Sequence, residues 1–139
     1  MSVNVLAVAG SVCMTLALLL AWCLAGVRTS SFVKRCFPNT QYLLKSHLDF
    51  LMMTGLLFIF FLMFRQIGLT PPALVLAAMS AGSIGNPAGL LALAITPDTS
   101  QRPVSKFGLL MLVSFTLTTI GYGGGAWYVA AAVLRGAIH

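Results

Sequence analysis

The chain has 139 residues, of which 59% are hydrophobic and only 7% are charged, and its mean hydropathy is +0.98. A soluble domain carries about 25% charged residues, so this composition excludes a water-exposed domain and predicts an integral membrane protein surrounded by the lipid bilayer. The net charge of +6 does not indicate nucleic-acid binding, because the basic residues form no stripe with interleaved aromatic side chains.

The first apolar segment, residues 3–27, contains no charged residue and is longer than the roughly 20 residues needed to cross a bilayer. A cleaved signal peptide carries basic residues before its apolar core. The first basic residue here is Arg28, so we expect a retained membrane anchor. Residues 28–46 then form a polar loop, in which Pro38-Asn39 indicates a turn.

Three further membrane helices are expected, at residues 46–67, 72–95 and 106–134, with a polar loop at residues 96–106. The pair Pro71-Pro72 suits the start of the third helix. The predicted fold class is therefore all-α: an integral membrane four-helix bundle in a single domain, residues 1–139. Four helices bury little core by themselves, so we expect a homo-oligomer.

The distribution of basic residues predicts how the chain is oriented in the membrane. Lys and Arg are retained on the cytoplasmic side. The opposite loops and ends carry only Arg65 and Arg135, so both termini are expected outside, as for a bacterial inner-membrane protein. The two loops placed in the cytoplasm carry six basic residues: Arg28, Lys34, Arg35, Lys45, Arg102 and Lys106.

A histidine stands at the head of the second apolar segment, "KSHLDFLMMTGLLFIFFLMF", residues 45–64. An ionisable residue kept in a membrane segment points to a functional site; the alternative is a histidine whose ring lies among the lipid headgroups. Below His47, a helix would place Leu51, Thr54, Gly55 and Phe58 on the same face. A flat hydrophobic cofactor could lie on that face, with the neutral imidazole as its axial ligand.

Asp49 points away from His47 on such a helix. We expect it to pair with Lys45 or with a neighbouring subunit.

The third helix contains the stretch "GSIGNPAGLL", residues 82–91. Asn86 needs a hydrogen-bond partner at membrane depth, and Pro87 frees a backbone carbonyl. Asn86 is therefore either a group facing substrate or cofactor, or part of a structural kink. Gly82 and Gly85 either clear space for a flat ligand or let two helices pack closely.

Tyr122, in the fourth helix, is the remaining catalytic candidate. Its phenol could orient or protonate a bound oxygen, and hydrogen bonding between helices is the alternative. Paired-carboxylate chemistry is excluded within one subunit, because the only acids are Asp49 and Asp98. Motifs for phosphate loops and two-histidine metal sites are absent from the sequence. His47 is the only internal histidine, so a bound metal would arrive inside a macrocycle.

The segments "LKSHLDFLMMTGLL" (residues 44–57) and "GSIGNPAGLL", together with the four-helix layout, resemble the styrene oxide isomerase family. The resemblance implies a homotrimer with haem b between subunits and His47 as the ligand of the iron. Ferric iron then acts as a Lewis acid on an epoxide of a hydrophobic substrate, which isomerises to an aldehyde. Asn86 matches the family's asparagine in the third helix.

The chain departs from the family pattern at three polar positions. The family has asparagine, aspartate and tyrosine where this sequence has Met53, Gly82 and Leu90. Haem binding, with His47 as metal ligand and Gly55, Gly82 and Gly85 beside the cofactor, therefore carries over better than the reaction with catalytic Asn86 and Tyr122.

Two alternatives remain open. The trimeric membrane enzymes of eicosanoid and glutathione metabolism have a similar layout, and "KSHLD" resembles their basic-Ala-His-x-Asn element. Met52 replaces their acidic residue, however, and their arginine-rich glutathione site has no counterpart here. A non-enzymatic membrane subunit or small transporter, in which His47 is only an interface residue, is the other alternative.

Overall fold

The computed structural model describes residues 1–96 and 106–136. The described residues form α1 (Asn4–Thr29), α2 (Ser31–Cys36), α3 (Thr40–Ile67), α4 (Ala73–Ile95) and α5 (Lys106–Leu134). All except the short α2 are long and apolar enough to cross a membrane. The prediction of an all-α fold with four helices able to span a membrane is thus confirmed.

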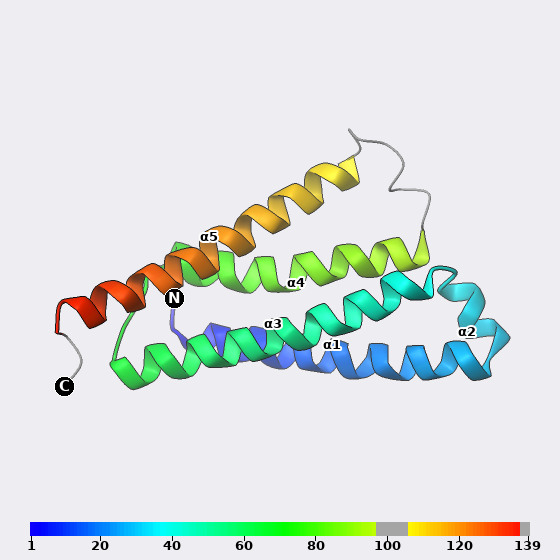
Figure 1. The fold of residues 1–139 in the computed structure, drawn as a ribbon, viewed down its shortest axis with the longest axis horizontal. Helices are drawn as coiled ribbons and strands as arrows, with labels where there is room; N and C mark the ends of the chain where they lie inside the picture. Colours follow the sequence, from blue (N-terminus) through cyan, green and yellow to red (C-terminus); the bar gives the residue numbers. More distant parts are fainter. Residues whose placement is uncertain (97–105, 137–139) are drawn as a thin grey trace.

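The helices form an elongated bundle in which α1, α3 and α4 lie side by side and α5 crosses over α4 (Figure 1). α1 packs against both α3 and α4, whereas α5 packs mainly against α4. The short α2 lies at one end of the bundle, where α1 ends and α3 begins (Figure 1). This end carries the basic residues of the first polar loop.

Residues 28–46 are not the continuous loop expected from their polarity. They form the end of α1, the six residues of α2 and the first turns of α3. The side-chain oxygen of Asn39 accepts a hydrogen bond from the backbone N–H of Tyr42, which satisfies a free donor at the start of α3. Leu43 is fully buried, and its burial stabilises this early start of the helix.

The opposite end of α3 stops at a glycine. Gly68 has φ 67°, and its N–H bonds back to the carbonyls of Arg65 and Phe64. This left-handed cap favours glycine because other residues clash there. Pro72 then directly precedes Ala73, the first residue of α4, so the helix begins one residue after the predicted start at residue 72.

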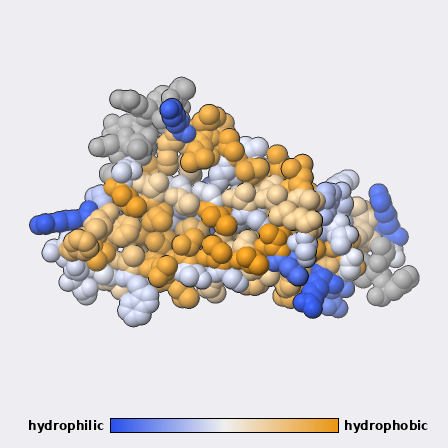
Figure 2. Space-filling model, turned by 180° about the vertical axis from the view of Figure 1, so that it is seen from behind, coloured by the Kyte–Doolittle hydropathy of each residue, from blue (hydrophilic) through white to orange (hydrophobic). Residues whose placement is uncertain are grey.

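The largest core side chains come from α3, with Phe50, Leu57 and Phe64 fully buried. Much of the remaining apolar surface faces outward, including Trp22 and Trp127. Figure 2 shows hydrophobic side chains across the middle of the molecule and hydrophilic ones towards its ends. This is the pattern of a protein whose middle is surrounded by hydrocarbon.

Candidate functional site

His47 lies in α3, half-buried against α1. Its Nδ1 is 2.9 Å from the backbone carbonyl oxygen of Ala17. A carbonyl oxygen only accepts hydrogen bonds, so Nδ1 carries the proton and donates it. In the neutral ring, Nε2 is then left with its lone pair, which is the state required of a metal ligand. Histidines that bind metals commonly have their other nitrogen fixed in this way.

The imidazole lines a groove of about 790 Å³ between α1 and α3, which we call the His47 groove. Its volume lies within the range of small-molecule and cofactor sites. Ala21 and Ala25 leave room along α1, and the lining is mostly apolar in the middle and polar towards the α2 end. The residues that line it are Ala21, Leu24, Ala25, Arg28, Thr29, Thr40, Gln41, Leu44, His47 and Leu48.

Gly55 lies two turns further along α3 and is exposed. A Cβ added to it would meet no atom within 4 Å. Leu51, between the two, is also exposed. The structure therefore brings His47 and Gly55 to the outer surface of α3, with open space beside the glycine.

Asp49 points to the other side of α3. Its Oδ2 accepts a hydrogen bond of 3.3 Å from the side-chain nitrogen of Asn86 in α4. The expected pairing with Lys45 is therefore wrong, and the Lys45 ammonium lies 5.4 Å from the ring centre of Tyr42 instead. The side chain of Asp49 turns inward because the amide on α4 offers it a donor within the bundle.

Asp49 and Asn86 belong to a larger set of polar residues inside the bundle. The hydroxyls of Ser83 and Tyr122 are 2.7 Å apart, which links α4 to α5. We call the whole set the interior polar group, and its members are Cys13, Ser46, Asp49, Ser83, Asn86 and Tyr122.

Two further contacts of this group lie at Pro87 and one helical turn before it. A proline has no N–H, so the carbonyl of Ser83, four residues earlier, loses its usual helical donor. The Cys13 thiol of α1 lies 3.7 Å from that carbonyl and donates to it. The Ser46 hydroxyl of α3 donates to the carbonyl of Pro87 itself at 2.8 Å. The freed Ser83 carbonyl thus links α4 to α1, and the Pro87 carbonyl links α4 to α3.

Gly82 and Gly85, predicted to lie beside a cofactor, face α5. A Cβ on Gly82 would lie 2.5 Å from the backbone nitrogen of Thr118, and one on Gly85 would lie 2.5 Å from the Ser114 hydroxyl. In this position the two glycines allow α4 and α5 to approach closely. The structure does not bring them to the His47 groove.

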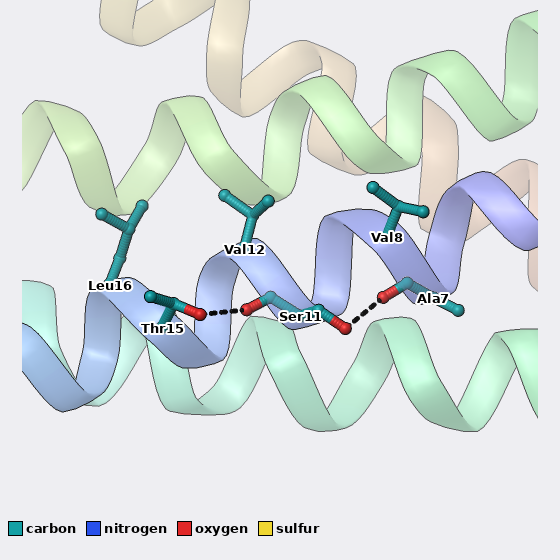
Figure 3. Close-up of a pocket in the computed structure, with 6 residues that line it drawn as sticks. All are labelled: Ala7, Val8, Ser11, Val12, Thr15 and Leu16. Carbon is teal, nitrogen blue, oxygen red and sulfur yellow. Dashed lines mark hydrogen bonds between the residues drawn. The ribbon is translucent and has the colours of Figure 1, made fainter.

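A second hollow, of about 480 Å³, lies along the outer face of α1 (Figure 3). Its two hydroxyl groups bond to carbonyls of the same helix: Ser11 to Ala7 and Thr15 to Ser11, each at 2.9 Å. Neither hydroxyl donor is left for a ligand. This hollow therefore offers a weaker candidate than the His47 groove.

The described residues contain no group of three or more His, Cys, Asp or Glu side chains that could hold a metal ion. A metal ion bound at His47 would therefore need its other ligands from a cofactor such as a macrocycle. Comparison with protein-family models, with curated proteins and with solved structures finds no match to this chain.

Sequence reasoning missed the roles of Cys13 and Ser46. Neither residue belongs to a motif: Cys13 lies within the first apolar segment, and Ser46 directly precedes His47. The one available signal was Pro87, which predicts a freed carbonyl but does not say which side chain reaches it.

Proposed function

We propose that this chain is an integral membrane protein that binds haem b through Nε2 of His47, in the manner of the styrene oxide isomerases that it resembles. The observation that carries the proposal is the bond from Nδ1 of His47 to the Ala17 carbonyl. It fixes the ring and its tautomer, and leaves the second nitrogen free for iron.

The surroundings of His47 suit a macrocycle better than a bare ion. A structural metal ion takes about four protein ligands, whereas His47 is the only histidine, cysteine or acidic residue that lines the groove. Haem supplies the other four nitrogen ligands itself and needs one axial histidine. The apolar middle of the groove matches the faces of a porphyrin.

The groove is open on the outer surface of α1 and α3. We propose that a second copy of the chain covers it, which gives a homo-oligomer and, by the resemblance, a trimer. Exposed Leu48 and Leu51 beside His47 would be buried in that contact. Complete burial of one such side chain contributes roughly 1.5–3 kcal/mol in water, and in lipid close packing must supply the corresponding gain.

The reaction implied by the resemblance is the isomerisation of a hydrophobic epoxide to an aldehyde. When bound, ferric haem supplies a Lewis acid for the epoxide oxygen. His47 would hold the cofactor, and the apolar groove walls would bind the substrate and exclude water. Asn86 and Tyr122 do not line the groove and are bonded to Asp49 and Ser83 in the bundle interior, so a catalytic role for them would require the substrate to reach that interior.

The test is an absorption spectrum of the detergent-purified protein, before and after dithionite. We expect a strong Soret band that shifts on reduction, and its loss in His47→Ala. His139→Ala is the matched control and should keep the band. A colourless wild-type protein from haem-sufficient cells, or full haem occupancy in His47→Ala, would contradict the proposal.

A small transporter is the second candidate, and the Asp49–Asn86 pair favours it. A carboxyl group that is half-buried between membrane helices is a feature of proton-coupled transport. A haem-free protein whose Asp49→Asn variant loses proton uptake in vesicles would support this candidate over haem binding.

A further inference from the structure

The His47 groove has two chemically different ends. His47 lies at its inner end, whereas Arg28, Thr29, Thr40 and Gln41 line the end near α2. Between them the lining is alanine and leucine. A ligand that matches this order has an apolar body, a metal centre and an anionic edge.

We infer that Arg28 binds the propionate carboxylates of haem, so that the groove selects a porphyrin whose carboxylates are free. This inference rests on the proposed haem binding at His47. A guanidinium forms paired, charge-assisted hydrogen bonds with a carboxylate. The propionates are the only anionic part of an otherwise apolar macrocycle. Their contact with Arg28 would therefore fix the direction in which the macrocycle lies in the groove.

The spacing along α1 supports this placement. Ala17, Ala21, Ala25 and Arg28 share one face of the helix. Arg28 is eleven residues from Ala17, or about 16 Å along the helix axis. This side of α1 thus carries the Ala17 carbonyl that holds His47 and, three turns later, the guanidinium of Arg28. The side chains between them are small.

Arg28 also lacks a competing partner among the described residues. Asp49 is the only acid of that part of the chain, and it is bonded to Asn86 in the bundle interior. The side chain of Arg28 is exposed in the last turn of α1, where it also faces the negative end of the helix dipole. A carboxylate of the ligand would provide the counter-charge that the protein does not.

The experiment compares two porphyrins on the full-length protein in neutral detergent. Haem b and its dimethyl ester, in which both propionates are esterified, are each titrated into haem-depleted protein. We expect wild type to bind the free acid at least about tenfold more tightly. Arg28→Gln should abolish this preference. Arg35→Gln, which removes an exposed charge outside the groove, should retain it.

The outcomes separate this inference from the haem proposal. If both porphyrins bind wild type equally and still require His47, the inference is wrong and haem binding stands. If neither porphyrin binds, both fail. Arg28→Lys tests for misfolding: it keeps the charge and should keep part of the preference. If Arg28→Gln only reduces co-purified anionic lipid, Arg28 is a lipid-headgroup site and the inference is overturned.

Discussion

The side-chain amide of Asn86 donates a hydrogen bond of 3.3 Å to the carboxylate of Asp49, across the contact between α4 and α3. Each of these residues is costly to bury alone in a membrane protein. The contact satisfies both at once and places them on the opposite side of α3 from His47. The two candidate regions, the His47 groove and the interior polar group, therefore face different neighbours.

The first prediction concerns this pair. Asn86→Ala should lower the free energy of unfolding by about 1 kcal/mol, because hydrogen bonds between membrane helices are worth roughly 0.6–1.7 kcal/mol. Detergent unfolding followed by circular dichroism measures it. Ser80→Ala is the control, since Ser80 bonds only to Leu76 of its own helix.

A double-mutant cycle with Asp49→Ala completes the test. The two substitutions should be non-additive by about the energy of the bond. Additive effects would mean that Asp49 and Asn86 do not interact.

The helices could be predicted from sequence because bilayer thickness fixes their length. The expected spans 72–95 and 106–134 agree with α4 and α5 to within one residue. The early start of α3 could not be predicted in this way. Its first turns are polar overall, and only tertiary burial of Leu43 shows that they belong to the helix.

The candidate site, too, could be predicted only in part from the sequence. Helical spacing predicts that His47 and Asp49 point in different directions, which the structure shows. It does not say which helix each will meet. The Ala17 carbonyl beside His47 and the Cys13 thiol beside Ser83 come from α1, and no local pattern in α1 indicates either contact.

The second prediction concerns the backbone freed by Pro87. Cys13→Ala should cost about 1 kcal/mol, because the Ser83 carbonyl loses its donor. Cys13→Ser should cost less, since a hydroxyl also donates. Thermal unfolding in detergent measures both variants.

A change at Pro87 supplies the critical comparison. Pro87→Ala restores an N–H for the Ser83 carbonyl, so the cost of Cys13→Ala should shrink in that background. An unchanged cost would show that Cys13 acts only through packing.

The third prediction concerns the contact between α4 and α5. A Cβ on Gly121 would collide with backbone atoms of Met79, and backbone cannot move aside as a flexible side chain can. Gly121→Ala should therefore destabilise the protein by roughly 1–3 kcal/mol. The midpoint of thermal unfolding is the measurement.

Gly123 gives a matched control two residues away. A Cβ there meets nothing within 4 Å, so Gly123→Ala should be neutral or stabilising by up to about 1 kcal/mol, through helix propensity. Equal destabilisation by both variants would remove close helix packing as the explanation.

The fourth prediction concerns the orientation of the chain, which the native cysteines can report. Cys36 is exposed at the end of α2, whereas Cys13 is buried and Cys23 is half-buried within a membrane span. The basic residues around α2 predict that this end faces the cytoplasm. A membrane-impermeant maleimide should therefore label Cys36 in inside-out vesicles and not in right-side-out vesicles. Cys36→Ser should remove the signal, and detergent should make both preparations equal. Labelling only in right-side-out vesicles would reverse the topology, and Arg28 and the α2 end of the His47 groove would then face the exterior.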